Sequence, residues 1–257
     1  MVHDNRILVL KFGSSVLRSE KDLPAAIHEV HRWSREGYQV VAVVSAFGDT
    51  TDQLTRRAHA VCLRPDEALL ATLLATGEAA SSALLGLALN QAAIPATVLD
   101  AERAGLCTAG ATLDSNLVSV NVANVLATLR KGVVVLPGFV GRGQSGETTL
   151  LGRGGSDLTA LFLAERLLAV CRLIKDVDGL YTSDPNFQSG PQAHRFTQVS
   201  YRTAAKVGIV VIQPKAVCFA EKHRLRFFVS AIGSNCGTEV GPFADRLEVQ
   251  EPEERVA

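Results

Sequence analysis

The sequence predicts an α/β fold: a three-layer sandwich with a mostly parallel central sheet flanked by helices. Six short runs rich in β-branched residues are almost continuously apolar, which is typical of strands covered on both faces. Stretches with helical periodicity lie between these runs, and such alternation favours a parallel sheet. We expect strands at 6–11, 39–45, 95–99, 132–136, 170–175 and 225–230, and helices at 22–36, 50–62, 66–92, 118–130, 157–168, 198–207 and 213–222.

The first two expected strands end on polar residues. RILVLK ends at Lys11, directly before Phe-Gly-Ser-Ser, and QVVAVVS ends at Ser45. Sheets of this kind bind ligands at the carboxyl ends of their strands. Gly13 and Ser14 would let the backbone approach a ligand and donate to phosphate oxygens, and Lys11 would add a positive charge. The alternative is a lysine that reaches solvent before an ordinary turn.

The helix expected at 66–92 carries a carboxylate among apolar side chains. One helical face comprises Leu70, Leu74, Glu78, Ser81 and Leu85. A carboxylate on such a face costs free energy unless a cation pairs with it, and the ammonium group of a ligand would do so. The alternative is a face that has rotated enough for Glu78 to reach water.

Glycines follow the fourth expected strand. Gly141, Gly143 and Gly146 match the dinucleotide-binding pattern GxGxxG, but a helix should begin at the third glycine, and Glu-Thr-Thr-Leu-Leu comes instead. We therefore expect a short β-ribbon with polar turns here. The sequence has no GxxxxGK[ST] pattern, which excludes a P-loop enzyme.

The stretch GRGGSDLTALFLAERL combines a flexible loop with a helix. We expect Ser156 to be the N-cap, with Asp157 in the first turn, where a carboxylate suits the helix dipole. Backbone donors of Gly154 and Gly155 and the helix N-terminus would form an anion site. The alternative is a well-capped helix beside a solvent-exposed Arg153.

The fifth expected strand, VCRLIK, ends at Lys175 and is followed by Asp-Val-Asp-Gly-Leu-Tyr. Charged and small residues therefore gather after several strands at one edge of the sheet. That edge is the candidate site.

The composition favours a cytoplasmic protein. Of 257 residues, 47% are hydrophobic and the formal net charge is zero, which gives no general attraction to nucleic acid or membranes. Five cysteines without CxxC pairing favour reduced thiols. We expect no signal peptide, no apolar stretch of membrane-spanning length and no metal site. One domain is expected over 1–245, with a charged tail or linker over 246–257.

Taken in order, these segments resemble the catalytic domain of the aspartokinases, in the amino acid kinase family, over about residues 6–240. KFGSSV resembles the family's KFGGTSV, VVSAFGDTTDQL is similar to its VVSA segment, and Thr76-Gly77-Glu78 resembles its Gly-Glu helix. LGRGGSDLTA is close to its most diagnostic run, and KDVDGLYTSDP is similar to its nucleotide loop TDVxGxYTxDP. Gly237-Thr238 stands where the family has a late Gly-Thr turn.

The resemblance implies the amino acid kinase fold and phosphorylation of the β-carboxylate of aspartate by ATP with Mg²⁺. By position, Ser45 would contact the aspartate or the transferring group, and Glu78 its ammonium. Arg153 would bind the α-carboxylate through two hydrogen bonds. Asp157 would orient Lys11 and the ammonium. The residues implied for the nucleotide and its phosphates are Lys11, Gly13, Ser14, Gly154, Gly155, Lys175, Asp176, Tyr181, Asp184 and Pro185.

The sequence departs from the family pattern in three ways. KFGSSV is one residue shorter than KFGGTSV. In GIVVIQP, which resembles the family's GAKVLHP, Val210 and Gln213 replace a lysine and a histidine. The family's lysine adds positive charge near the phosphates, and the candidates to replace it are Lys175, Lys206 and Lys215. The chain also ends where aspartokinases usually continue into regulatory ACT domains, so we expect no feedback inhibition.

Two alternatives to an aspartate kinase stay open. One is a kinase for another small amino acid, because Arg153 and Glu78 recognise only the α-amino-acid end. The other is a degenerate domain that binds nucleotide or amino acid without turnover, as a regulatory or assembly module beside, for example, a homoserine dehydrogenase domain. Val210 and Gln213 favour the degenerate domain, whereas intact Lys11, Arg153 and Asp157 oppose it. The family also leads us to expect a homodimer.

Overall fold

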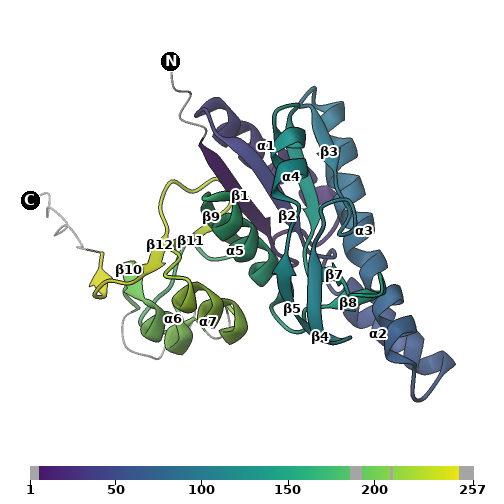
Figure 1. Cartoon of the computed structure of the whole chain (residues 1–257). Coiled ribbons are helices and arrows are strands. Elements are labelled where there is room, and N and C mark those ends of the chain that lie inside the picture. Colours follow the sequence, from purple (N-terminus) through teal and green to yellow (C-terminus); the bar gives the residue numbers. More distant parts are fainter. Residues whose placement is uncertain (1–5, 186–192, 209–210, 249–257) are drawn as a thin grey trace, which may run out of the picture.

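The computed structural model describes residues 6–185, 193–208 and 211–248. Helices flank a long central sheet, as the sequence predicts (Figure 1). The strands are β1 (Ile7–Phe12), β2 (Gln39–Val44), β3 (Ala96–Val98), β4 (Cys107–Ala111), β5 (Asp114–Ser119), β6 (Val133–Pro137), β7 (Val140–Arg142), β8 (Thr148–Leu150), β9 (Val170–Lys175), β10 (Phe196–Ser200), β11 (Phe227–Ala231), β12 (Thr238–Gly241) and β13 (Arg246–Leu247). The α-helices are α1 (Leu23–Arg35), α2 (Thr50–Val61), α3 (Glu67–Gln91), α4 (Val122–Leu129), α5 (Gly155–Leu167), α6 (Tyr201–Val207) and α7 (Pro214–Lys222), and a 3₁₀ turn (Glu20–Asp22) precedes α1.

The six strands predicted from the sequence form one uninterrupted parallel block. In the described residues, the main sheet has the order β13-β10-β12-β11-β9-β1-β2-β6-β3, and every pair from β11 to β3 is parallel. The antiparallel pairs, β11 with β12 and β10 with β13, involve strands that we did not predict. The parallel block aligns the carboxyl ends of β1, β2, β6 and β9 at one edge.

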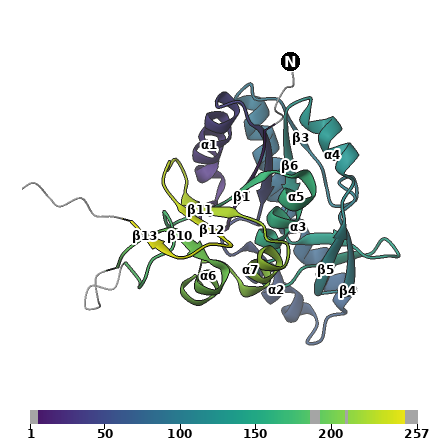
Figure 2. The same ribbon diagram turned by 60° about the vertical axis from the view of Figure 1, so that its left-hand side comes forward.

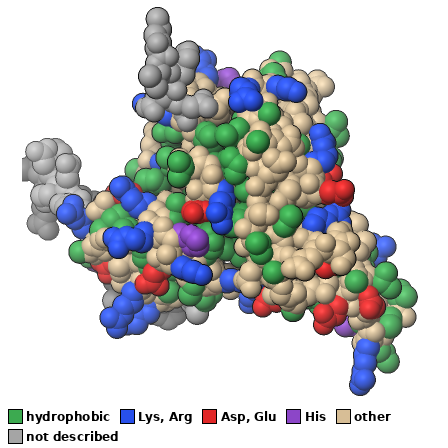
Figure 3. Space-filling view, viewed as in Figure 1, with side chains coloured by type: hydrophobic (Ala, Val, Ile, Leu, Met, Phe, Trp, Pro, Cys, Tyr) green, Lys and Arg blue, Asp and Glu red, His purple; other side chains and the backbone are tan. Residues whose placement is uncertain are grey.

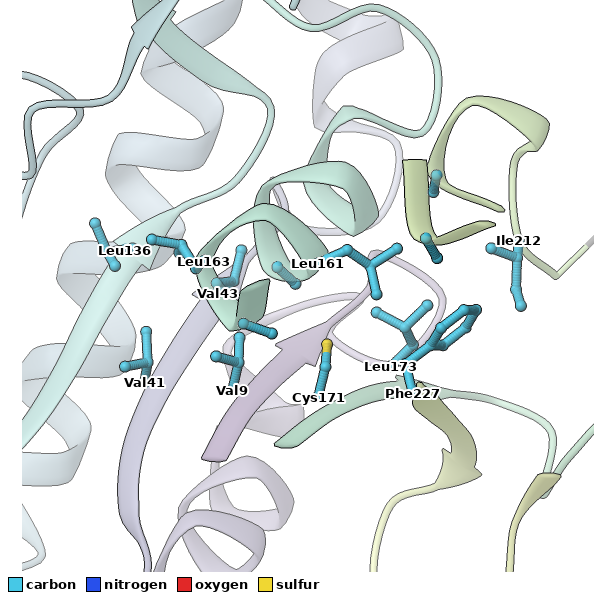
Figure 4. Close-up of a cluster of buried hydrophobic side chains, with 14 of the residues drawn as sticks. Val9, Val41, Val43, Leu136, Leu161, Leu163, Cys171, Leu173, Ile212 and Phe227 are labelled. Carbon is cyan, nitrogen blue, oxygen red and sulfur yellow. The ribbon is translucent and has the colours of Figure 1, made fainter. Parts of the chain in front are cut away.

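Alternating side chains of β1 enter two separate cores. Leu8, Leu10 and Phe12 pack with residues of α1 and α3 on one face of the sheet. Val9 faces the other way, where Leu161 and Leu163 of α5 cover β1 and β2 (Figure 4). Figure 2 shows α1 and α4 on opposite sides of the sheet. The strands are therefore buried on both faces, which explains their continuous apolar runs.

A second sheet, with the order β5-β4-β7-β8, lies beside the first. Its strands β7 and β8 are the β-ribbon expected around 141–146, and they pair antiparallel. Two expected helices begin later than predicted. Residues 118–119 finish β5, and Asn121 then caps α4. Residues 198–200 finish β10, and the Ser200 side chain caps α6 by accepting a hydrogen bond from the Thr203 amide.

We expected the charged tail to begin at residue 246, but the folded structure extends beyond that residue. Arg246 and Leu247 form β13, which pairs with β10, and the carboxylate of Glu248 forms an ion pair with Arg195. Residues 246–248 therefore belong to the folded domain, because their backbone and charges have partners there. Residues 249–257 lie outside the described part of the chain.

Helix α3 contradicts the expectation that the chain has no apolar stretch of membrane-spanning length. Within the described residues, it is the one helix long and apolar enough to cross a membrane by length and composition alone. It packs against α1, α2 and strands β3, β6 and β8, and it carries the buried carboxylate of Glu78. These contacts bury 39% of its most apolar window, whereas Leu69 and Leu87 are exposed, so packing within the chain accounts for part of its apolar sequence. On the face in Figure 3, acidic and basic side chains are both spread over the surface, consistent with the zero net charge.

Candidate active site

The predicted site residues all line one pocket of about 910 Å³ at the carboxyl edge of the parallel block. It is formed by the turns after β1 and β2, the loop before α5, the segment after β9 and the α6–α7 region, together with Glu78 of α3 and Phe139. The pocket residues that we predicted are Lys11, Gly13, Ser14, Ser45, Glu78, Arg153, Gly154, Gly155, Asp157, Lys175, Asp176, Tyr181, Asp184 and Pro185.

Two lysines share one carboxylate at the floor of the pocket. Lys11 Nζ lies 2.8 Å from Asp157 Oδ1, and Lys175 Nζ donates a hydrogen bond to Asp157 Oδ2 at 2.8 Å. Lys11 is the next-to-last residue of β1, Lys175 is the last residue of the adjacent strand β9, and Asp157 stands in the first turn of α5. All three residues are buried, with Lys11 only 5% exposed, so the alternative of a solvent-directed lysine is wrong.

Burial and charge act against each other in this cluster. Burial pushes the pKa of Asp157 up, but the two ammonium groups outweigh it and hold the pKa at about 2. Burial lowers the pKa of Lys11, and the facing carboxylate of Asp157 opposes that shift. With both lysines protonated, the cluster presents one net positive charge toward the pocket.

Glu78 reaches the same pocket from α3. It is 3% exposed, so the alternative in which it turns to water is wrong. Its Oε1 accepts a hydrogen bond from the Ala46 amide at 3.2 Å, whereas its Oε2 is buried without a hydrogen-bond partner among the described residues. Burial raises the pKa of Glu78 to about 7. A buried oxygen of this kind is satisfied by a ligand that brings a donor.

The close approach of α3 to the end of β2 places Glu78. Gly77 makes this approach possible, because a Cβ at this position would lie 3.0 Å from the Ala46 side chain. The hydroxyl of Ser81 donates to the Ser45 carbonyl at 2.8 Å, which ties the same face of α3 to the strand end. The contact between α3 and the end of β2 therefore holds Glu78 close to Ser45.

The loop before α5 differs from our prediction in its cap. Helix α5 begins at Gly155 and its N-cap is Gly154, whose φ of 80° suits glycine. Ser156 is buried inside the first turn instead. It packs so closely against Gly138 that a Cβ added at Gly138 would clash with it. Arg153 is exposed on the loop, and no ion-pair partner for it is found among the described residues.

The segment after β9 is tied to the late Gly-Thr turn. Thr238 Oγ1 accepts a hydrogen bond from the Leu180 amide at 2.8 Å and donates to the Phe196 carbonyl at 2.6 Å. The Tyr181 hydroxyl donates to Asp178 at 2.7 Å. Burial and the neighbouring carboxylate raise the pKa of Tyr181 to about 12. These bonds fix the wall that we predicted to contact the nucleotide.

The three lysines that could replace the family's lysine at position 210 differ in their contacts. Position 210 itself lies outside the described residues. Lys175 is bound to Asp157, and Lys215 to Asp114 and two backbone carbonyls. Lys206 lines the pocket, is exposed, and has no ion-pair partner in the part of the chain that the structure describes. Its exposed place in the pocket lining singles it out among the three lysines.

Known proteins resemble this chain over most of its length. Residues 6–230 match the model of the amino acid kinase family. The aspartokinase of Thermus thermophilus is 34% identical over 248 residues, which cover 94% of this chain and 61% of that protein. The crystal structure of aspartate kinase from Synechocystis aligns with a TM-score of 0.81 and 30% identity, covering 96% of this chain and 40% of that one. The structure of E. coli aspartokinase III in complex with lysine and aspartate aligns with a TM-score of 0.77 and 25% identity, covering 91% of this chain and 64% of that one.

The chain spans about three fifths of the length of the curated relatives it matches.

Proposed function

Because the chain belongs to the amino acid kinase family, we propose that it transfers the γ-phosphoryl group of ATP to the β-carboxylate of aspartate. Relatives named aspartokinase, at 34% identity, support this choice of substrate. The observation that carries the proposal is the pairing of unsatisfied charges in one pocket. Glu78 offers a buried carboxylate oxygen and Arg153 a guanidinium, the two counterparts that the ammonium and α-carboxylate of an amino acid require.

The proposed reaction needs positioning and positive charge more than covalent help. A β-carboxylate oxygen of aspartate attacks the γ-phosphorus, the bond from that phosphorus to the bridging oxygen breaks, and ADP leaves with the electron pair. Lys11 and Lys175, held by Asp157, would face the charge on the transferring oxygens. Amides of the turn containing Gly13 and Ser14 would donate to the phosphates, since both residues line the pocket.

Lys206 completes this arrangement in our proposal. It is the lysine that lines the pocket without an ion-pair partner among the described residues, and it lies on the α6–α7 side with Val211 and Gln213. We infer that it supplies the second positive charge near the nucleotide phosphates. The absence of a lysine at position 210 then does not imply an inactive domain.

Mg²⁺ fits this pocket as a companion of ATP. The described residues contain no group of three or more His, Cys, Asp or Glu side chains that could hold a metal ion. Mg²⁺ commonly binds through substrate phosphates, water and one or two carboxylates, so such a group is not required. Asp176, which lines the pocket, would be a protein ligand, and the ion would neutralise charge on the phosphate oxygens.

The other expectations stay predictions. They are a cytoplasmic location, a homodimer, association with a homoserine dehydrogenase domain, and a single catalytic domain. A kinase for another small amino acid and a domain without turnover are the rivals. The intact charge cluster of Lys11, Asp157 and Lys175 argues against the latter, because burying it costs free energy that a mere binding module has no need to bear.

Hydroxylamine trapping separates these functions. The purified protein is incubated with ATP and Mg²⁺ and, in parallel, with aspartate, glutamate or N-acetylglutamate. The aspartate kinase predicts an acyl hydroxamate with aspartate alone. Hydroxamate with another substrate would support the other amino acid kinase, and nucleotide binding without any hydroxamate would support the domain without turnover.

A further inference from the structure

Lys215, in the first turn of α7, is saturated by three acceptors from another part of the fold. Its Nζ donates to the Asp114 carboxylate, to the Ser115 carbonyl at 2.9 Å and to the Leu151 carbonyl at 2.8 Å. A lysine ammonium has three donors, so this set uses all of them. Two of the acceptors are backbone carbonyls, which fixes the direction of the interaction more firmly than a surface ion pair does.

These acceptors surround the start of the loop that carries Arg153. Leu151 directly precedes Gly152 and forms an isolated β-bridge with Asp114. The Asp114 carboxylate packs against Gly152, where a Cβ would clash with it. On the other side of Arg153, the side chain of Gln213 packs in the same way against Gly154. The first turn of α7 and the residue before it therefore hold both ends of the loop.

The side chain of Arg153 has no comparable anchor of its own. It is exposed and has no ion-pair partner in the described residues, so its position follows from the backbone of residues 152–154. Gly152 and Gly154 have φ angles of 70° and 80°, a conformation that glycine adopts without strain, so the path of the loop depends on its contacts with neighbouring segments. Lys215 supplies such a contact at the Leu151 carbonyl, and its bond to Asp114 holds the carboxylate that packs against Gly152.

We propose that Lys215 is the positioning residue for Arg153: by binding the Leu151 carbonyl and Asp114, it sets where the guanidinium meets the α-carboxylate of the substrate. This inference rests on the function proposed above. Lys215 does not line the pocket, so it acts through the loop and contacts neither substrate nor nucleotide. Its loss should therefore affect recognition of aspartate far more than recognition of ATP.

The test compares Lys215→Met, Lys215→Arg and a control, Arg226→Met. Methionine keeps an unbranched side chain but removes the three donors. Arginine keeps the charge, and Asp114→Asn serves as a second weakening variant if Lys215→Met does not fold. Arg226 forms an ion pair with Glu239 on β12 and does not line the pocket, so its variant removes a paired cationic side chain without touching the loop. The measurements are steady-state kinetics with each substrate and amide hydrogen exchange at residues 152–155 without ligands.

We expect Lys215→Met to lower kcat/KM for aspartate by about 10- to 100-fold, the range for a displaced positioning group, with little change in KM for ATP. The loop amides should exchange faster, Lys215→Arg should recover part of both effects, and Arg226→Met should show neither. Unchanged exchange and an unchanged KM for aspartate would overturn the proposal, as would equal losses in Lys215→Met and Arg226→Met. If exchange quickens but the wild-type protein neither binds nor phosphorylates aspartate, the proposed function fails and the role of Arg153 fails with it, while Lys215 still anchors the loop.

Discussion

The floor and the rim of the pocket hold their positive charges in opposite ways. At the floor, Lys11 and Lys175 are buried and share the carboxylate of Asp157. At the rim, Arg153 and Lys206 are exposed, and the described residues give them no ion-pair partner. The floor charges are thus part of the folded structure, whereas the rim charges are available to a ligand. Loss of the shared carboxylate at the floor should therefore change both stability and activity, whereas substitutions at the rim should change activity alone.

The largest expected effect is that of Asp157→Asn. The change leaves two ammonium groups buried together without their countercharge, so we expect a loss of about 3–5 kcal/mol in the free energy of unfolding, the cost of breaking a buried ion pair. Turnover should vanish as well. Urea denaturation followed by circular dichroism measures the first effect, and the hydroxamate assay the second.

Lys11→Met is the matched variant for Asp157→Asn. It removes one lysine but leaves Asp157 bound to Lys175, so turnover should be lost while most of the stability remains. If Lys11→Met destabilised the protein as much as Asp157→Asn, the two lysines would not be interchangeable partners of the carboxylate. Retained turnover would refute the role that we give to Lys11.

A smaller effect is expected at the rim. Lys206→Met should lower kcat/KM for ATP by about tenfold, less than the 10²–10³ typical of a buried transition-state donor, because solvent screens an exposed charge. The melting temperature should not change. Arg202→Met is the control, since Arg202 is exposed on the same helix but does not line the pocket. Equal kinetics of the two variants would show that Lys206 has no specific role.

The smallest expected effect is the pH dependence set by Glu78. Its pKa is raised by burial to about 7, so below pH 7 the carboxylate becomes neutral and loses its attraction for an ammonium. KM for aspartate should therefore rise as the pH falls below about 7, and Glu78→Gln should have a high KM without this dependence. A pH-independent KM in the wild type would contradict the assignment.

The same group has an opposite effect on stability. Because the folded-state pKa of Glu78 lies above its ordinary value of 4.5, the folded protein binds a proton more tightly than the unfolded chain does. Its contribution to the free energy of unfolding should then grow as the pH falls from about 7 to 4.5, in the absence of substrate. Glu78→Gln removes this contribution, which denaturation at several pH values can measure.

The sequence predicted the parallel block because its strands are buried on both faces and therefore apolar throughout. It did not predict β4 and β5, since each has only one fully buried residue, Thr108 in β4 and Ser115 in β5. Such short, exposed and polar strands lack both the continuous and the alternating apolar pattern. Their pairing depends on neighbours far along the chain, as for β4 with β7.

The candidate site was predicted residue by residue, but its internal contacts were not. Motifs placed Lys11, Asp157 and Glu78 near one edge, and the structure brings them into one pocket. The sequence did not reveal that Asp157 serves two lysines, or that Gly138 packs against Ser156 and leaves the capping position to Gly154. These features depend on distances between strands that no local pattern encodes.

The shared carboxylate also has a consequence for biosynthesis. Lys11 leaves the ribosome with the first strand, but Asp157 and Lys175 follow only after β2, β3 and β6 have been made. Until β9 pairs with β1, the first strand has an open edge, and Lys11 lacks the carboxylate that it shares with Lys175. A nascent chain should therefore assemble the cluster of Lys11, Asp157 and Lys175 in one late, long-range step, together with closure of the sheet. Truncated translation products should then fail to bind nucleotide even when their first half has begun to fold.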